Sequence, residues 1–544
     1  MFFKRGNELP CAPVKEVSNK NSIMAAEEDR LAKAFENKII FLTGGTGFMG
    51  KIFIERLLRD TEVGKIYLLV RPKRGKTPRQ RVIEIFDDLL FERLKEKMSI
   101  ETILSKTHVI CGNCEELNIG MSEEDRQFII ENITQIFHFA ATIRFDEAMK
   151  KAVLMNTRGS REMLKLALEC KKLELYGHMS TAYCHLHVQF LLEQPYDPPA
   201  DPNEIIAMIE SMPDEEIENQ SKGILEKLNL PNTYAFTKSL AEALVVEARN
   251  KHKLPVLIFR PSIILATWRD PIPGYVDNFN GPIGLMLAVG KGVARSMYCD
   301  QKSYGDFVPV DIAINALFIS VWNFYTYKNE DHFIIHFTSS NEIRLTWEDM
   351  AILGKETIQN DYPFNQILWY PSITMTQYRW LHNIRAFLFH WIPAYVVDFL
   401  LQMLGYQPFM KKAALRVDKA VEVLEYYANN QWDFDASIQC LFKSRLTPYE
   451  EEKYKVNARG ISIRQVFSES ALGLRRYVDK TPDSMIPAAF RLLKIMNIVD
   501  KVTKLVVYGS LFYWLYTLIL ALIGGANIPF TILKLLFCIF AILI

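Results

Sequence analysis

The chain has 544 residues, and its 64 Lys and Arg against 63 Asp and Glu give a formal net charge of +1 at pH 7. The length allows two or three domains, and the balanced charge excludes the basic, aromatic-lined surface of a nucleic-acid-binding protein. Eight scattered cysteines that follow no secretory signal are typical of a reducing compartment.

A glycine-punctuated turn stands near the start of the chain. A wholly apolar run at 39–42 leads into the turn TGGTGFMG at 43–50, and a helical pattern follows. Strand, glycine turn and helix form the opening of a dinucleotide-binding unit. Gly44 would make the tight turn, Gly47 would let the backbone approach a pyrophosphate, and Gly50 would allow close packing of helix and strand.

Apolar strand patterns recur along the first half of the chain and alternate with helical patterns. We expect further strands at 65–71, 107–111, 135–139, 174–180 and 255–260. This alternation predicts an α/β fold with a doubly wound parallel sheet of the Rossmann type. Ligands of such sheets bind at the carboxyl ends of the strands, where Ala140-Ala141 and Ser180-Thr181 stand in this sequence.

The second expected strand ends in the basic run Arg71-Pro-Lys73-Arg74. NAD-dependent enzymes carry an acidic residue at this place, which holds the ribose 2′-hydroxyl. Cations suit a 2′-phosphate instead, so the run favours NADPH over NADH. A solvated basic loop is the alternative interpretation.

A tyrosine and a lysine one helical turn apart are the candidate catalytic pair. Tyr234 and Lys238 lie in a helical pattern that begins near residue 232, so their side chains share one face. A phenol with a pKa of ~10 is a sluggish proton donor near neutral pH. A nearby ammonium and a cationic nicotinamide would stabilise the phenolate, and Thr181 or Ser180 would hold a substrate carbonyl oxygen.

Two close pairs of residues are candidate metal ligands. Cys111 and Cys114 have the spacing of half a zinc site, and His185 and His187 are two residues apart. Neither pair has further ligands at suitable spacing, so we expect no metal.

The middle of the chain supplies segments that would face a substrate. Residues 186–231 are acidic and proline-rich with a poor helical pattern, and we expect an insertion over the active site. Beyond Pro261 the sequence becomes loop-rich, which is typical of a substrate-facing segment.

An aromatic-rich stretch at 379–405 has His382, Arg385, His390 and Asp398 interspersed in it. These groups disfavour a plain transmembrane helix. We prefer an interfacial or acyl-binding helix, with a buried core helix as the alternative.

Two apolar runs close the chain. The first, 505–523, has no charge and is long enough to cross a bilayer, and the second, 528–544, is borderline in length. The cations that precede them are Arg475, Arg476, Arg491, Lys494, Lys501 and Lys504. By the positive-inside rule the large N-terminal part would face the cytosol. A pair of buried core helices is the alternative.

These patterns together predict four parts of the chain. They are a polar, partly disordered cytosolic tail at 1–37, a dinucleotide-binding and substrate domain at 38–370, a helical domain at 371–482 and a membrane anchor at 483–544.

The sequence resembles the fatty acyl-CoA reductases of the insect type, which are extended short-chain dehydrogenases/reductases. The resemblance rests on motifs that occur in order, TGGTGFMGK, YLLVRPKRG, HFAATIRFDE, MNTRG, HMSTAYC, YAFTKSLAE, FRPSII, PGYVDNFNGPIGL and DFVPVDIAINAL. FHWIPAYVVDFLLQMLGYQP and NNQWDFD then resemble the C-terminal male-sterility domain of that family.

The resemblance implies NADPH-dependent reduction of a long-chain acyl-CoA to a primary alcohol, through an aldehyde, at a membrane. It implies a catalytic set of Tyr234, Lys238 and Thr181 with Ser180 beside it. The implied cofactor residues are Thr43, Gly44, Gly45, Thr46, Gly47, Phe48, Met49, Gly50, Arg71, Lys73, Asn113, Ala140, Ala141, Asn156, Tyr234, Lys238 and Pro261. Asn156 would order the surroundings of the lysine.

The sequence departs from the family pattern at three positions. Asn113 replaces an Asp that contacts the adenine, and Asn457 and Arg464 stand near the places of an Asp and a Trp. The expected location is the endoplasmic reticulum membrane, with the peroxisome as the alternative. Two other functions stay open: an extended reductase acting on a sterol or sugar nucleotide, and a non-catalytic lipid-binding descendant.

Overall fold

The computed structural model describes residues 28–73, 75–339, 341–457 and 460–522. The chain divides into two compact units. Unit 1 comprises Met1–Asn278, Tyr304–Leu345 and Asn430–Gly473, and unit 2 comprises Phe279–Ser303, Thr346–Asn429 and Leu474–Ile544. The units therefore interleave along the chain, whereas the sequence analysis expected contiguous parts.

Unit 1 is built on a seven-stranded parallel sheet with the order β12-β7-β5-β4-β1-β2-β3. Its strands are β1 (Ile39–Thr43), β2 (Lys65–Val70), β3 (Thr107–Cys111), β4 (Gln135–His138), β5 (Leu175–Met179), β7 (Val256–Pro261) and β12 (Ile334–Phe337). This order confirms the predicted Rossmann-type sheet. The direction of winding reverses between β1 and β4, and ligands of such sheets bind at this switch point.

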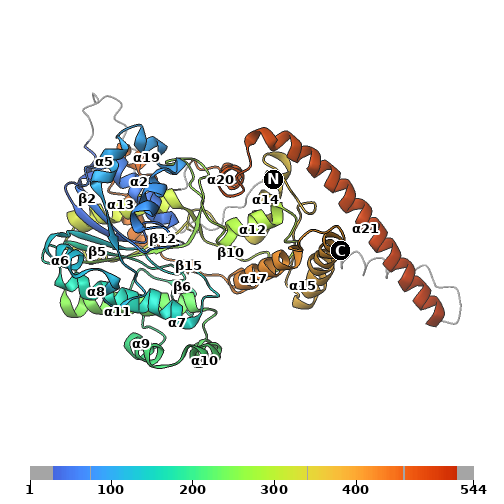
Figure 1. Ribbon diagram of the computed structural model, residues 1–544, viewed down its shortest axis with the longest axis horizontal. Helices are drawn as coiled ribbons and strands as arrows, with labels where there is room; N and C mark the ends of the chain where they lie inside the picture. Colours follow the sequence, from blue (N-terminus) through green and yellow to red (C-terminus); the bar gives the residue numbers. More distant parts are fainter. Residues whose placement is uncertain (1–27, 74, 340, 458–459, 523–544) are drawn as a thin grey trace. The chain divides into compact units, whose positions relative to one another are not determined.

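Helices cover both faces of the sheet (Figure 1). One face carries α2 (Phe48–Asp60) and α13 (Val310–Thr326), which contact each other, and the other carries α8 (Gly159–Glu169) and α11 (Thr233–His252). The insertion at 186–231 forms two helices, α9 (Pro202–Ser211) and α10 (Asp214–Lys227), despite its poor helical pattern. Asp201 and the acidic first turn of α10 favour these helices, because carboxylates stabilise helix N-termini.

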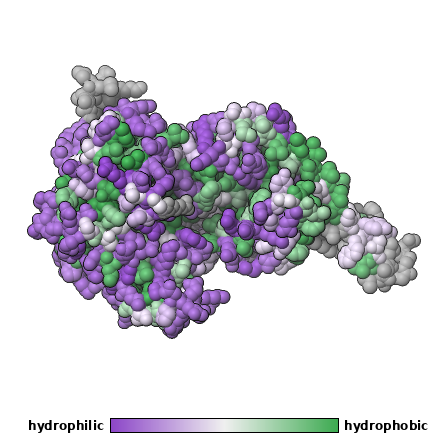
Figure 2. Space-filling view, in the orientation of Figure 1, coloured by the Kyte–Doolittle hydropathy of each residue, from purple (hydrophilic) through white to green (hydrophobic). Residues whose placement is uncertain are grey.

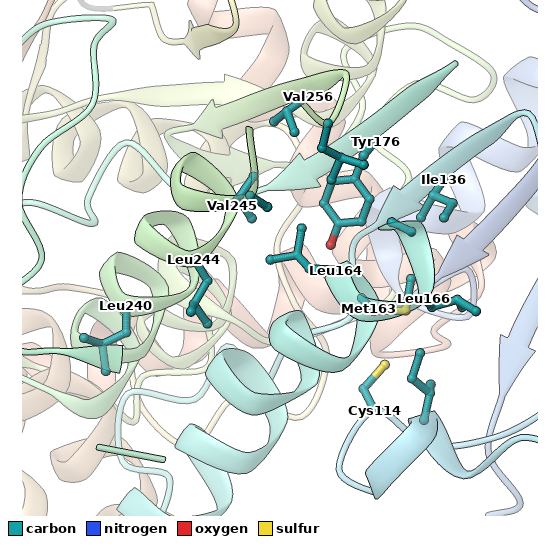
Figure 3. Packing of buried hydrophobic residues seen from close by; sticks show 14 of the residues in the cluster. Cys114, Ile136, Met163, Leu164, Leu166, Tyr176, Leu240, Leu244, Val245 and Val256 are labelled. Atoms are coloured by element: carbon teal, nitrogen blue, oxygen red, sulfur yellow. The ribbon is translucent and has the colours of Figure 1, made fainter. Parts of the chain in front are cut away.

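The apolar layer between the sheet and its α8–α11 face fixes the position of α11. Tyr176 of β5 and Val256 of β7 lie against the inward residues of both helices, Leu164, Leu244 and Val245 among them (Figure 3). Each of these side chains is at most 5% exposed, and burying one apolar side chain contributes ~1.5–3 kcal/mol. The helix that carries the tyrosine and lysine is therefore held rigidly against the sheet.

The segment after residue 430 returns to unit 1. Its strand β15 (Asp433–Phe434) pairs in parallel with β6 (Phe190–Leu191), and the indole of Trp432 donates a hydrogen bond of 3.0 Å to the carbonyl of Leu186. These contacts join a C-terminal segment to the insertion that follows β5, which explains why unit 1 is not contiguous in sequence.

Unit 2 is mainly helical. Its helices and paired strands are α12 (Gly281–Gly290), β9 (Ser296–Tyr298), α14 (Trp347–Asn360), β14 (Thr374–Thr376), α15 (Arg379–Ala386), η4 (Phe387–Trp391), α16 (Ile392–Met403), α17 (Met410–Ala428), η5 (Leu474–Val478), η6 (Asp483–Met485) and α21 (Ile486–Leu522).

Among the described residues, one helical stretch, Arg379–Met403, is long and apolar enough to cross a membrane, which by length and composition alone is a weak indication. The run expected at 505–523 forms the second half of α21, a helix of 37 residues, up to Leu522. The run expected at 528–544 lies outside the described residues.

Candidate active site

The glycine turn joins β1 to α2 and lies at the switch point of the sheet. Gly44 has φ +74, and a Cβ there would stand 2.7 Å from the backbone nitrogen of Ala140 at the end of β4. The hydroxyl of Thr43 accepts a hydrogen bond of 3.2 Å from that same nitrogen. Only glycine suits this close, left-handed turn.

The N-terminus of α2 is open to an anion. Gly47 is the capping residue, its N–H donates to the carbonyl of Gly44 at 2.9 Å, and within the described part of the chain no side chain caps the helix. First-turn N–H groups and the helix dipole favour a phosphate at such a position. The turn at 43–50, with Gly45, Thr46, Phe48, Met49 and Gly50, therefore fits a dinucleotide phosphate group.

The basic run after β2 is joined by an arginine that the sequence analysis missed. Arg81, on α3 (Pro78–Phe86), donates to the carbonyl of Arg71 at 2.6 Å and to the hydroxyl of Thr46 at 3.4 Å. Burial and the neighbouring Arg71 lower the pKa of Arg81. The guanidinium of Arg71 donates to Glu115 at 3.1 Å, and Lys73 forms a backbone bridge with Lys76.

Asn113 closes a tight turn after β3. Its side-chain oxygen accepts from the N–H of Glu115 at 3.2 Å, and its amide nitrogen donates to Glu116 at 3.4 Å. An aspartate could accept the first of these bonds but could not make the second, because an ionised carboxylate has no donor. The family departure at this position thus changes a local bond within the turn.

Asn156 links the end of β4 to α11. It lies in η3 (Val153–Arg158), a π-helical turn, and bonds both backbone groups of Thr142 at 2.8 and 3.0 Å. Its amide also donates to the hydroxyl of Thr237 at 2.9 Å, one residue before Lys238. These bonds fix the loop that carries Ala140 and Ala141 and connect it to α11 next to Lys238.

Tyr234 and Thr181 meet at the carboxyl end of β5. The side chain of Asn232 caps α11 by accepting from the N–H of Ala235 at 2.9 Å, so Tyr234 stands in the first turn. The ring of Tyr234 stacks on Phe145 with centroids 5.4 Å apart. Burial raises the pKa of Tyr234, and its hydrogen bond with the Thr181 side chain opposes that rise.

Thr181 has two further backbone contacts. Its hydroxyl lies 3.4 Å from the carbonyl of Pro261 at the end of β7 and accepts from the N–H of Tyr183 at 3.2 Å. The predicted site residues Thr181 and Pro261 therefore lie side by side at the strand ends.

Lys238 is buried, and its ammonium donates to the carbonyl of Met179 at 2.7 Å. Burial lowers the pKa of Lys238 to about 8, while Cys184 and Glu242 oppose the shift. The phenol of Tyr234 responds to burial, Thr181 and Cys184. The sequence predicted that the ammonium of Lys238 would act directly on the pKa of Tyr234, but Lys238 is not among the groups that shift this pKa.

The two candidate hydroxyls have different partners. Ser180 donates to the carboxylate of Glu242 at 2.6 Å, whereas Thr181 bonds Tyr234. Of the two hydroxyls, Thr181 therefore lies beside the phenol, whereas Ser180 is bonded to Glu242.

Glu242 is the centre of a buried polar network that the sequence analysis missed. It lies one turn beyond Lys238 on α11 and is 1% exposed. Arg260 donates to it from Nε at 3.1 Å and from Nη2, and His185 Nε2 lies 3.2 Å away. An acid one turn beyond the lysine on the same predicted helix was the available signal.

One group of metal-ligand atoms lies close together among the described residues: Cys184, His185 and Glu242, within 4.8 Å of one another. His187, the partner weighed in the sequence analysis, is not part of it. The guanidinium of Arg260 already neutralises Glu242, which opposes binding of a second cation.

The segment after Pro261 is tied to α2. The ammonium of Lys51 lies 2.5 Å from the carboxylate of Asp277 and donates to the hydroxyl of Tyr275 at 3.3 Å. The helix that follows the glycine turn therefore also positions the segment expected to face the substrate.

Family models and known relatives match most of the chain. Residues 42–317 match an NAD-binding family model described as male sterility protein, and residues 389–481 match a second model of the same description. The chain is 34% identical over 493 residues to fatty acyl-CoA reductase wat of Drosophila melanogaster, covering 91% of this chain and 94% of that one. It is 34% identical over 466 residues to fatty acyl-CoA reductase 1 of Mus musculus, covering 85% and 89%.

A solved structure supports the fold. The terminal R domain from the myxalamid PKS-NRPS biosynthetic pathway matches with a TM-score of 0.54 and 18% identity, over 82% of this chain and 92% of that one. At this identity the likeness concerns the fold alone. The matched models and the relatives, which extend over most of the chain, show that this protein belongs to the fatty acyl-CoA reductase family of oxidoreductases.

Proposed function

We propose that the chain reduces a long-chain fatty acyl-CoA to a primary alcohol and CoA, with NADPH as reductant and an aldehyde as intermediate. The observation that carries the proposal is the half-buried Tyr234, hydrogen-bonded to Thr181 one helical turn before Lys238. This trio lies at the same sheet edge as the uncapped N-terminus of α2.

The turn at 43–50 and the cations beyond it would hold the cofactor, which supplies hydride when bound. Thr181 and Tyr234 would hold the thioester oxygen between their hydroxyls. As negative charge develops on that oxygen, Tyr234 would donate its proton or a strong hydrogen bond. Lys238, whose pKa of about 8 leaves it largely protonated at pH 7, would stabilise the charge left on the phenol.

The thioester reduction consumes one hydride and one proton. The carbon–sulfur bond breaks, the sulfur leaves as the CoA thiol with that proton, and an aldehyde remains. A second hydride and a proton from Tyr234 then give the alcohol. The same pair of hydroxyls serves both steps, because each creates negative charge on the same substrate oxygen.

The choice of NADPH rests on Arg71 and Arg81. The guanidinium of Arg81 donates both to the backbone carbonyl of Arg71 and to the hydroxyl of Thr46 in the glycine turn. Arginine matches the geometry of a phosphate, and an acidic residue that would favour a free 2′-hydroxyl is absent from the run at 71–74.

Replacing Arg81 with Gln is expected to reduce the preference for NADPH over NADH. Loss of one charge-assisted contact costs about 1.5–3 kcal/mol, so the ratio of kcat/KM values should fall by roughly tenfold or more. Steady-state kinetics with both cofactors measures the ratio. Arg79→Gln changes an exposed arginine of the same helix and serves as the control; an equal effect of both variants would contradict the assignment.

Replacing Gly50 with Ala is expected to weaken cofactor binding. A Cβ there would overlap the carbonyl oxygen of Gly44 and lie 2.7 Å from the Cα of Gly45, so the turn itself must move. Overpacking costs about 1–3 kcal/mol, which predicts a rise in the NADPH dissociation constant of roughly tenfold. Fluorescence titration measures it. Gly354→Ala, where no atom lies within 4 Å of the new Cβ, should bind normally.

We propose that the apolar second half of α21 anchors the enzyme in a membrane. α21 runs to Leu522 without a charge after Lys504, and Leu505, Val506 and Trp514 are 74%, 60% and 62% exposed. Hydrophobic residues gather on the surface over α21 (Figure 2). Cations precede this run, so the catalytic part would face the cytosol, at the endoplasmic reticulum or the peroxisome.

Mass spectrometry of products formed by membranes carrying the full chain tests the function. Incubation with NADPH and long-chain acyl-CoA should yield the matching primary alcohol and free CoA. Reduction of a sterol or a sugar nucleotide in place of acyl-CoA would contradict the substrate class. Binding of acyl-CoA without oxidation of NADPH would identify a non-catalytic descendant.

A further inference from the structure

The helical stretch α15–η4–α16 in unit 2 has three ionisable side chains buried and most of its large apolar side chains exposed, whereas Arg379 at its first position is exposed and pairs with Glu425. Arg385, His390 and Asp398 are 6%, 5% and 2% exposed. They follow one another at intervals of five and eight residues, and the π-helical turn η4 at 387–391 keeps them on one side. A helix of a soluble domain has the opposite arrangement.

The inward groups form bonds that fix how this helix is rotated. His390 Nε2 accepts from the backbone N–H of Arg295 and Ser296 at 2.9 and 3.2 Å. Because Nε2 is an acceptor, Nδ1 carries the proton, and it donates to Asp418 at 3.0 Å.

Asp398 fixes the other end of the stretch. Its carboxylate accepts from the backbone N–H of Phe409, Met410 and Lys411 at 2.9, 2.8 and 3.0 Å, and so caps the N-terminus of α17. The outward direction of the apolar side is therefore set by hydrogen bonds at both ends of the helix.

The outward side is a continuous apolar face. We call it the aromatic face, and its members are Trp380, Ile384, Phe387, Leu388, Ile392, Tyr395, Val396, Phe399, Leu400 and Met403, which are 37–71% exposed. They recur at intervals of three or four residues and so line one side of the helix. Contiguous apolar surface of this kind marks an interaction site, whereas single exposed apolar residues do not.

Exposed cations follow the aromatic face in the chain, and the carboxylate of Glu425 beside its first residues is already paired with Arg379. Between 379 and 416 the one carboxylate in the sequence is Asp398, which is buried, whereas Lys411, Lys412 and Arg416 are exposed. The ammonium of Lys411 lies 4.3 Å from the ring centroid of Tyr395 on the aromatic face. Aromatic and apolar groups bordered by cations match the interface of a bilayer that contains anionic lipids.

The aromatic face belongs to the same body as α21. The guanidinium of Arg295 donates to Asp500 of α21 at 3.0 Å and lies 4.8 Å from the ring centroid of Phe389 in η4. This connection favours a lipid surface as the partner, since our proposed function already puts the end of α21 in a membrane.

We propose that the aromatic face lies in the plane of the membrane interface and binds anionic lipid through Lys411, Lys412 and Arg416. The stretch does not cross the bilayer, because crossing would break the bonds of His390 and Asp398 and move both groups into hydrocarbon. Unit 2 then contacts the membrane at a second place besides α21. This inference rests on the membrane part of the proposed function.

Labelling from the lipid phase tests it on the full chain. The protein is placed in vesicles of phosphatidylcholine, with or without phosphatidylserine, that contain a diazirine-bearing phospholipid, and tryptic peptides are read by mass spectrometry after illumination. Label is expected on 386–411 several-fold above 345–355, a peptide of unit 2 that includes exposed Ile352, and more with phosphatidylserine. Label on peptides of α21 beyond Lys504 with none on 386–411 would overturn the inference while leaving the anchor intact.

Matched variants sharpen the result. Leu400→Gln combined with Met403→Gln should cut the label on 386–411 by roughly half or more, because it removes apolar side chains from the interface. Ile352→Gln should leave it unchanged. Lys411→Gln combined with Lys412→Gln should abolish the gain from phosphatidylserine, which is then read on the tryptic peptide 386–416 because the variant lacks the cleavage sites at 411 and 412. Protection of 386–411 by excess palmitoyl-CoA would assign the aromatic face to the substrate and overturn the inference.

Discussion

Replacing Tyr234 with Phe is expected to lower turnover of acyl-CoA by about 10²–10⁴-fold, the range that general acid catalysis contributes. The variant removes one oxygen atom and keeps the ring that stacks on Phe145. The phenol is not part of the glycine turn, so the dissociation constant of NADPH should change little. Stopped-flow measurement of NADPH oxidation, together with a fluorescence titration of NADPH, separates the two effects.

A second tyrosine provides the control for this variant. Tyr325 accepts a hydrogen bond of 2.9 Å from Gln135, the first residue of β4, and so lies at the amino end of the sheet. Tyr325→Phe removes the same atom from a ring that, like Tyr234, is half-buried, and it should keep full activity. Comparable losses in both variants would point to a general effect on the fold, and wild-type turnover in Tyr234→Phe would exclude the phenol as the acid.

The sheet could be predicted because parallel strands buried on both faces give continuous apolar runs. The strands β1, β2, β3, β4, β5 and β7 were predicted from this pattern. β12 was missed although β4 is equally short and also contains a buried histidine. β12 is separated from its partner β7 by a long segment of loops and helices, so the alternation of strand and helix does not point to it.

The sequence predicted those parts of the candidate site whose residues lie close together in the chain. Tyr234 and Lys238 share one helix, so their geometry follows from a four-residue separation. The different partners of Ser180 and Thr181 depend on Glu242, which lies 62 residues from Ser180 in the chain. Arg81 was missed for a similar reason, since the turn at 72–77 that brings it back to Thr46 has no regular periodicity.

For the stretch at 379–405, the hydropathy pattern does not determine which side of the helix the ionisable residues occupy. These residues were recognised as an obstacle to a membrane span. A π-helical turn shifts the phase of the helix at 387–391, so ideal helical spacing would misplace His390. The buried position of these groups follows from partners far along the chain, such as Arg295.

Replacing Arg260 with Met is expected to destabilise unit 1 by about 3–5 kcal/mol, because breaking a buried ion pair leaves an uncompensated charge. Arg260 and Glu242 have side chains 0% and 2% exposed. Arg260 also donates to the carbonyls of Leu192 and Gln194 at 3.1 and 3.0 Å, which would lose these bonds. The thermal midpoint of the full chain should fall by roughly 5–10 °C.

Two further variants show whether the loss comes from the stranded carboxylate. Arg260→Met combined with Glu242→Leu removes both charges and should recover part of the stability, since an apolar pair of similar volume is often no worse than a buried ion pair. Arg126→Met breaks a pair with Glu169, whose side chain is 48% exposed, and should cost less than ~1 kcal/mol. If Arg260→Met were no worse than Arg126→Met, Glu242 would not depend on Arg260, and the network behind Lys238 would not hold the catalytic helix in place.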